Sequence, residues 1–177
     1  QLLGQGTNDY LDGGAGNDIV NDYEISLNGV VTHDADTLIG GAGADQLTSF
    51  GGDDRLFGGE GDDYLLSAAT AGSVTHVGDA GNDVIDGGAD TDTSVYSGNR
   101  ADYNVTFMAN GRYSITDLRS GSPDGTDTVL NVEYFQFADQ TVPVSGIINQ
   151  APIAAFTSNA NPAAPGQAIA FDASASY

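Results

Sequence analysis

The chain has 177 residues, of which 25 are acidic and only four are Lys or Arg, so its formal net charge is −21. A surface this acidic repels phosphate groups, and we therefore expect neither nucleic acid nor an anionic membrane as a partner. The absence of cysteine excludes disulfides and thiol chemistry, and no apolar run is long enough to insert into a membrane.

Residues 1–95 repeat with a period of nine. Each unit opens with glycines, as in Gly13-Gly14-Ala15-Gly16, and carries an Asp at its sixth position. Two residues beyond this Asp stands an aliphatic residue, except in the last unit, which has Ser94. We expect a short strand after each Asp, with the eighth side chain of the unit pointing inward. The recurring residues are Asp9, Asp18, Asp36, Asp45, Asp54, Asp63, Asp83 and Asp92.

The acidic residues are concentrated in this repeat region, where 18 acids and one arginine give a net charge of −17. Of the 25 acids in the chain, 22 are Asp, which fits a short carboxylate held close to its own turn. Calcium prefers carboxylate and carbonyl oxygens, and glycine-rich turns can direct several carbonyls at one ion. Because one inward aliphatic residue per strand makes a thin core, metal binding must contribute much of the folding free energy.

The unit Gly-Gly-x-Gly-x-Asp-x-aliphatic-x is clearest at residues 13–21, 40–48 and 58–66. It resembles the calcium-binding nonapeptide of the RTX (repeats-in-toxin) family. The resemblance implies an all-β fold, a right-handed parallel β-roll in which two nonapeptides make one coil. It also implies several Ca²⁺ ions, each held between successive turns on one side of the roll. Proteins of this family are commonly exported from bacteria by type I secretion, so we expect a secreted or cell-surface location.

By this resemblance, each ion takes backbone carbonyls and one Asp from each of two turns, and four complete pairs follow. Two of the pairs are rich in glycine: Gly41, Gly43 and Asp45 with Gly58, Glu60 and Asp63, and Gly59, Gly61 and Asp63 with Gly78, Ala80 and Asp83. Two are poorer in glycine: Gly14, Gly16 and Asp18 with Val31, His33 and Asp36, and Thr32, Asp34 and Asp36 with Ser49, Gly51 and Asp54. Asp9 and Asp92 remain as half-sites beside interrupted repeats.

Two segments break the repeat. Residues 22–30 keep its length but lose its pattern, and residues 67–77 lose the pattern and run two residues longer. We expect each segment to replace a calcium turn with a loop. His33 and His76 are the only histidines of the chain. They lack the spacing of a zinc protease motif, and we expect both to be polar loop residues.

Beyond Val95 glycine becomes rarer, and alternating segments predict strands at residues 103–107, 112–116 and 132–137. Residues 122–125 give a turn signal, and we interpret Asp124 and Asp127 as turn residues rather than as ligands of another ion. This region resembles the β-rich segment that often follows RTX arrays. Since the end of a solenoid needs a cover for its strand edges, we expect residues 96–144 to form a cap with an aromatic core.

The rest of the chain has a different composition. Residues 145–152 read as a linker, and residues 153–177 resemble the start of a PKD-type immunoglobulin-like module. Such a sandwich needs about seven strands, and only two or three would fit here. The expected division is therefore a β-roll over residues 1–95, a β-rich cap over 96–144, a linker and a truncated module, as in a fragment of a longer protein.

Two functions fit these features. The first is a calcium-binding structural and folding module of a large secreted bacterial RTX protein, an adhesin, which the PKD-like start favours. The second is the C-terminal calcium-binding tail of a secreted protease, lipase or polysaccharide-active enzyme, and a catalytic motif ahead of Gln1 would decide for it. We expect no catalysis by this chain, because it has no nucleophile–base pair and its carboxylates serve the metal. Other parts of the parent protein would bind any adhesin ligand or substrate.

Overall fold

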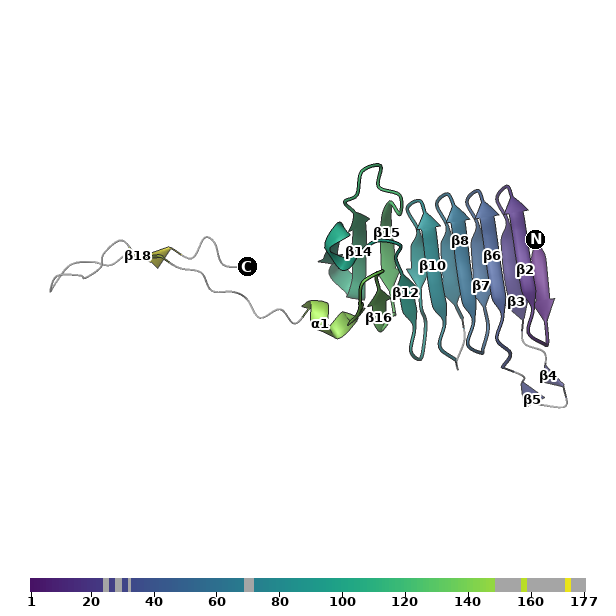
Figure 1. Cartoon of the computed structure of the whole chain (residues 1–177). Coiled ribbons are helices and arrows are strands. Elements are labelled where there is room, and N and C mark those ends of the chain that lie inside the picture. Colours follow the sequence, from purple (N-terminus) through teal and green to yellow (C-terminus); the bar gives the residue numbers. More distant parts are fainter. Residues whose placement is uncertain are drawn as a thin grey trace.

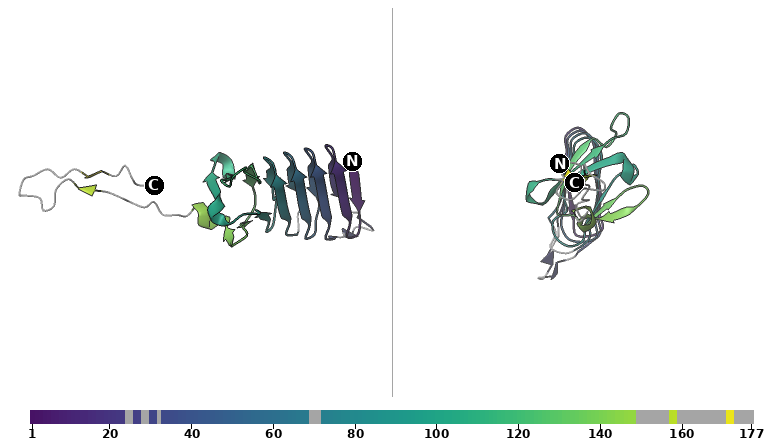
Figure 2. Two further views of the ribbon diagram at one scale, coloured as in Figure 1. Left: turned by 45° about the horizontal axis from the view of Figure 1, so that its top comes forward. Right: turned by 90° about the vertical axis from the view of Figure 1, so that its left-hand side faces the viewer.

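The computed structural model describes residues 1–23, 26–27, 30–31, 33–68, 72–148, 157–158 and 171–172. Most of these residues lie in β-strands and in the turns between them, which confirms the expected all-β roll. The coils of the roll stack along one axis, seen from the side and end-on in Figure 2. The N-terminus lies at one end of this axis, and a β-rich segment lies at the other (Figure 1).

Two sheets form the two faces of the roll. The first sheet contains, in order of pairing, β1 (Leu2–Gln5), β3 (Ile19–Tyr23), β7 (Gln46–Ser49), β9 (Tyr64–Ser67), β11 (Val84–Asp86), β15 (Thr126–Leu130), β14 (Arg112–Asp117) and β13 (Tyr103–Phe107). The second contains β17 (Thr141–Pro143), β16 (Tyr134–Gln136), β12 (Thr93–Val95), β10 (Thr75–Ala80), β8 (Arg55–Glu60), β6 (Thr37–Ala42) and β2 (Tyr10–Ala15). Strands of the repeat region pair in parallel with the strand one coil away.

The core of the roll consists of two rows of inward side chains, one from each sheet. The eighth residue of the repeat fills these rows, as expected, and each row stacks in register from coil to coil. The fully buried members are Val20, Leu47, Leu65 and Ile85 in the first sheet and Leu38 and Leu56 in the second. A row this narrow buries little apolar surface per coil, so side-chain packing alone supplies only part of the stability.

The coils differ in length, and this changes one expected pairing. Leu38 pairs with Leu56, 18 residues later, but Leu11 pairs with Leu38, 27 residues later. The nine extra residues leave the roll between β3 and β6 and include the antiparallel pair β4 (Ser26–Leu27) and β5 (Val30–Val31), which projects from one edge (Figure 1). The segment between β3 and β6 therefore adds a loop to a coil, rather than forming half of a coil of its own, although Asp22 and Tyr23 still lie on β3 within the roll.

The expectation that His76 lies in a loop is wrong. His76 is on β10, where it pairs with Leu56 on one side and Ser94 on the other. Its side chain has 0% exposure and fills the inward row of the second sheet, where the coil before it has Leu56 and the coil after it has Ser94. The two extra residues of segment 67–77 are accommodated ahead of β10, since Arg55 pairs with Thr75, 20 residues later.

Both sheets continue past residue 95. β15 pairs in parallel with β11, and β16 pairs in parallel with β12, so residues 126–136 add one more coil to the roll. Between β12 and β15 the chain makes an excursion through η1 (Arg100–Asp102), β13, η2 (Ala109–Gly111) and β14, with β14 antiparallel to both β13 and β15. The predicted strands at 103–107 and 112–116 are confirmed, the one at 132–137 is shorter, and β15 was not anticipated.

An aromatic cluster fills the interior at this end of the roll. Its members are Tyr96, Tyr103, Tyr113, Phe135 and Phe137, all of which are buried. The rings of Tyr96 and Phe137 stack with centroids 5.5 Å apart, and those of Tyr113 and Phe135 meet edge to face at the same distance. Phe135 also continues the inward row of the second sheet, because it pairs with Ser94. The aromatic side chains of this segment are thus core residues, as the sequence indicates.

The C-terminal part follows β17, which pairs antiparallel with β16, and the short helix α1 (Val144–Ile148). Of the PKD-like residues the structure describes only β18 (Thr157–Ser158) and β19 (Phe171–Asp172), which pair antiparallel. Residues 149–156, 159–170 and 173–177 lie outside the described part, so the truncated module stays a prediction. Among the described residues, no helix has the length and apolarity needed to cross a membrane.

Candidate calcium sites

Five carboxylates lie one above the other along one edge of the roll. These residues, hereafter the first column, are Asp18, Asp45, Asp63, Asp83 and Asp127. In each step along the column, the backbone N–H of one Asp donates to Oδ1 of the Asp in the next coil, at N···O distances of 2.7, 2.8, 2.8 and 2.9 Å. All members except Asp18 are buried. One oxygen of each carboxylate from Asp45 onward is therefore committed to the coil before it.

In three of these carboxylates the second oxygen is free to bind a cation. Oδ2 of Asp45, Asp63 and Asp83 is buried and has no hydrogen-bond partner, which is costly for a charged group in the absence of a ligand. The Asp45 oxygen and the carbonyl oxygen of Gly58 converge over Gly40, where an added Cβ would lie 2.5 and 2.6 Å from them. Carboxylate and carbonyl oxygens are the donors that Ca²⁺ prefers, so the residues of this edge fit the ion.

The turn glycines are needed for the coils to stack so closely. Gly41 has φ +112°, and a Cβ there would collide with the carbonyl oxygen of Gly14 in the coil before. Gly59 has φ +108° and meets the carbonyl of Gly41 in the same way. Only a residue without a side chain combines this backbone conformation with this approach, and the carbonyls of successive turns are brought together as a result.

A second column follows the opposite set of turns. The N–H of Asp9 donates to Oδ1 of Asp36 at 2.6 Å, and that of Asp36 donates to Oδ1 of Asp54 at 2.9 Å. Val74 then stands where a carboxylate is missing, and its N–H donates to Asp92, whose own N–H donates to Glu133. The second column, defined as Asp9, Asp36, Asp54, Asp92 and Glu133, is thus interrupted in the middle, whereas the first column is continuous.

The structure brings together three of the four turn pairs that the sequence predicts. In these pairs Asp45 bonds with Asp63, Asp63 with Asp83, and Asp36 with Asp54. The matching turns stack as well: Gly41 pairs with Gly59, Gly61 donates to the carbonyl of Ala80, and Gly52 packs on the carbonyl of Asp34. Of the further predicted positions, Gly43 and Gly51 lie in these turns, and Gly58, Glu60 and Gly78 lie in the C-terminal parts of the strands that lead into them, β8 and β10. Their role as ligands stays a prediction.

The predicted pairing of Asp18 with Asp36 through His33 is wrong. Gly14 pairs with Gly41, Gly16 donates to the carbonyl of Ala42, and Asp18 bonds with Asp45. The added loop moves Asp36 into the other column, opposite Asp9, which is therefore more than an isolated half-site. His33 is exposed ahead of β6 and does not face the Gly14 turn.

Three carboxylates of the edges and interior were missed by sequence reasoning. Asp127 lies on β15, is 2% exposed and ends the first column, so it is not a turn residue. Glu133 ends the second column. Asp22, in the segment that lost the repeat pattern, lies with Asp9 and Asp36 in a group whose ligand atoms are all within 4.8 Å of one another. All three lie outside the nonapeptide phase, so the repeat pattern gives no signal for them.

The electrostatics of the columns favour the binding of a cation. Burial, reinforced by neighbouring carboxylates, raises the pKa of Asp54 and Asp63 to about 6 and that of Asp83 and Asp92 to about 7. The pKa of Asp127 rises to about 8, through burial and the charges of Asp83, Asp124 and Asp117. Without a metal these groups resist ionisation, because each charge is desolvated and repelled by the next. A divalent cation between them would reverse both effects.

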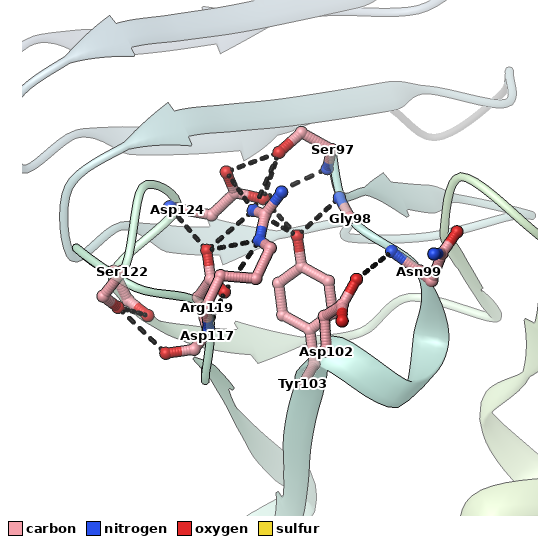
Figure 3. A network of polar contacts seen from close by, with 10 residues as sticks. Ser97, Gly98, Asn99, Asp102, Tyr103, Asp117, Arg119, Ser122 and Asp124 are labelled. Atoms are coloured by element: carbon pink, nitrogen blue, oxygen red, sulfur yellow. Dashed lines mark hydrogen bonds and ion pairs between the residues drawn. The ribbon is translucent and has the colours of Figure 1, made fainter.

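Carboxylates beyond the roll show the contrasting case, drawn in Figure 3. Asp117 and Asp124 form ion pairs with Arg119 at 2.7 and 2.9 Å, and the hydroxyl of Tyr103 donates to Asp124. The bonds from the Arg119 guanidinium hold the pKa of Asp117 at about 2. These acids are satisfied by protein groups alone, so this network ties the excursion of residues 97–125 together without a metal.

Comparison with known families agrees with this geometry. The model of the RTX calcium-binding nonapeptide repeat matches residues 1–21, 34–65 and 77–95, in four copies. The repeats are of the RTX calcium-binding type. The matched segments carry every recurring Asp and leave out the looped segment 22–33 and the lengthened segment 66–76. The RTX repeats and the clustered acidic side chains together establish Ca²⁺ as the ion of this roll. No curated protein matches the chain.

Proposed function

We propose that the chain is a calcium-triggered folding and structural module of a large secreted bacterial RTX protein. The observation that supports this most directly is the first column, a continuous stack of carboxylates in which the second oxygens of Asp45, Asp63 and Asp83 are buried without partners. The columns hold ten carboxylates, and the whole chain has only four Lys or Arg residues. Cations from solution must therefore neutralise the stack for the coils to close.

The cap end provides the part of the fold that needs no metal. Its aromatic cluster and its arginine network satisfy their own apolar and polar groups. Because β15 and β16 extend the two sheets, this segment offers a ready edge on which the calcium-dependent coils can assemble. We propose that it acts as a cap and as the folding template, and that folding takes place after export into calcium-rich surroundings.

For the parent protein we propose an adhesin, because the sequence after the roll resembles the start of a PKD-type module. The module itself would carry no catalysis, and its role would be that of a spacer. Sequencing the gene ahead of Gln1 tests the assignment of the parent: a run of further repeats supports an adhesin, whereas a catalytic motif there would make this chain the tail of a secreted enzyme.

The folding proposal is tested by far-ultraviolet circular dichroism of the whole chain in chelator and during calcium titration. We expect the β-sheet signal of the repeat region to appear cooperatively, with a midpoint on the order of 10⁻⁴ to 10⁻³ M, as in extracellular calcium modules. The hydrodynamic radius should decrease in parallel, since the chelated region is self-repelling. A β-sheet spectrum that is complete in chelator and unchanged by calcium would refute the proposal.

A further inference from the structure

The coil at one end of the stack, built from β1 and β2, keeps the glycine turn of the interior coils (Figure 1). Gly14 has φ +90° and Gly16 has φ +112°, in the left-handed region that the later turn glycines also occupy. In the later coils a neighbour fills the space beside the glycine, since a Cβ at Gly59 would collide with the carbonyl oxygen of Gly41. At Gly14 and Gly16, no described atom beyond the adjacent residues lies within 4 Å of the added Cβ. The end coil thus leaves open the space that a neighbouring turn fills elsewhere in the roll.

The two column carboxylates of this coil have the same one-sided arrangement. In the regular part of each column, Oδ1 of an Asp accepts the backbone N–H of the coil before it, as Oδ1 of Asp45 accepts the N–H of Asp18. Asp9 and Asp18 donate in this way to the next coil, but no described donor bonds to Oδ1 of either. Both are half-buried, whereas Asp36 and Asp45 are buried. Two acceptors therefore lie where a further coil would place its N–H groups.

The strands and the core row are open on the same side. β1 and β2 are the outermost strands of the two sheets, so each has one edge without a partner among the described residues. Leu2 and Leu11 are only half-buried, although Val20 and Leu38, with which they pair, are fully buried. An open edge of this kind is a template for pairing with added strands. The opposite end of the roll is different, because its outermost strands, β13 and β17, run antiparallel to their neighbours.

We propose that this end face of the roll is a docking surface for another glycine-rich, calcium-binding coil. Such a coil supplies turn carbonyls to the spaces at Gly14 and Gly16, backbone N–H groups to Asp9 and Asp18, and parallel strands to the edges of β1 and β2. The cap end of a second copy does not fit, because antiparallel strands cover the side of the last coil that would have to dock. The partner is therefore an uncapped coil of the same repeat.

Docking of a coil would extend both columns by one step. Each step brings a further carboxylate toward Asp9 or Asp18, and these groups repel one another in the absence of a cation. The docking surface therefore rests on the proposed function, since it needs calcium to hold the new coil in place. It should add calcium ions to the roll rather than compete for those already bound. Because the cap closes the other end, the roll can be extended in one direction only.

A regular coil of the chain itself provides the test. A copy of residues 46–63 joined ahead of Gln1 keeps the nine-residue phase, because Leu2 aligns through Val20 with Leu47. The control extension has the same residues in shuffled order. In calcium, we expect only the ordered extension to bind additional ions by calorimetry and to slow hydrogen exchange in β1 and β2. If the two extensions behave alike, the docking surface is refuted. If the chain binds no calcium with or without an extension, it is the proposed function that fails.

A proline in β2 shows where the added coil binds. The carbonyl of Asp9 accepts the N–H of Thr37 in the next coil, so alternation along the strand directs the N–H of Asp12 to the open edge. Proline is tolerated at such an edge position, and Asp12 is exposed. We expect Asp12→Pro to abolish the gain from the ordered extension and Asp12→Ala, which removes the same charge, to keep it. A gain that survives Asp12→Pro contradicts the proposal. Loss of folding in the unextended Asp12→Pro chain also contradicts it, because this N–H would then be needed within the roll.

Discussion

His76 allows a quantitative test of how the interior of the roll is built. It occupies the inward row between Leu56 and Ser94, is fully buried, and neither ring nitrogen has a hydrogen-bond partner. A neutral imidazole held in this way costs about 1–3 kcal/mol for each unsatisfied polar atom. His76→Leu restores the residue type of the row. We therefore expect the free energy of unfolding to increase by about 2 kcal/mol at pH 7.5. This value is at the low end of the cost of two unsatisfied atoms, because leucine does not match the shape of the ring.

The pH dependence gives the sharper prediction. Burial lowers the pKa of His76 from 6.5 to about 4, so the unfolded chain binds this proton more readily than the folded chain. Above pH 6.5 the ring is neutral in both the folded and the unfolded chain, and the free energy of unfolding decreases as the pH falls from 6.5 toward 4. Between pH 7.5 and pH 5 the loss amounts to about 2 kcal/mol, since one pKa unit corresponds to about 1.4 kcal/mol.

The assay is denaturant unfolding at a fixed, saturating calcium concentration, for wild type and His76→Leu at both pH values. Titration of the carboxylates is common to the two proteins and cancels in their difference. The advantage of the leucine variant should grow from about 2 kcal/mol at pH 7.5 to about 4 kcal/mol at pH 5. A constant difference between wild type and His76→Leu would refute the assignment of a buried neutral imidazole.

Three further predictions concern the columns. Asp63→Asn should lose calcium from both of the steps it joins, whereas Asp62→Asn, which removes an exposed charge next to it, should keep the full number of ions by calorimetry. Gly58→Ala places a Cβ against Oδ2 of Asp63 and 2.7 Å from the carbonyl of Gly78, so we expect at least a tenfold loss of affinity at this step without loss of the other ions. The pKa values of Asp83 and Asp127 are raised to about 7 and about 8, so the folded calcium-free chain binds more protons than the unfolded one. The stability of the calcium-free fold therefore falls as the pH rises toward these values. In calcium-free buffer the β-sheet signal should consequently be larger at pH 5 than at pH 8, and the opposite trend would show that these groups are ionised without metal.

The nine-residue period predicted most of the roll because it fixes side-chain direction and turn position at once. Each eighth residue points inward and each sixth residue is an edge carboxylate, and such local rules hold wherever the repeat is regular. The period could not settle the partner of Asp18. A nine-residue segment keeps the phase of the repeat whether it lies in a coil or loops out of it, and only the stacking of Gly14 on Gly41 distinguishes the two.

The remaining errors arise where contacts are distant in sequence. Asp127 joins Asp83 across 44 residues, with two antiparallel strands between them, and no periodicity extends over that excursion. His76 reaches the core because two extra residues restore the register just ahead of β10. Asp22 looked like part of a degenerate unit, yet strand alternation places it inside beside Val20. In each case tertiary packing decided the position, and the local pattern had no means of indicating it.

The hydrogen bonds between coils run parallel to the axis of the roll, and this determines how the module responds to mechanical force. Tension applied between the N-terminal coil and the coil formed by residues 126–136 acts along the axis and loads the pairing of one coil with the next, so we expect the coils to detach one at a time. Each regular coil of 18 residues, once released, adds roughly 60 Å of extended chain. Because a bound ion stabilises the folded coils, we expect the force at which each coil detaches to rise with calcium concentration. The module would therefore behave as an extensible tether whose stiffness is set by the surrounding medium.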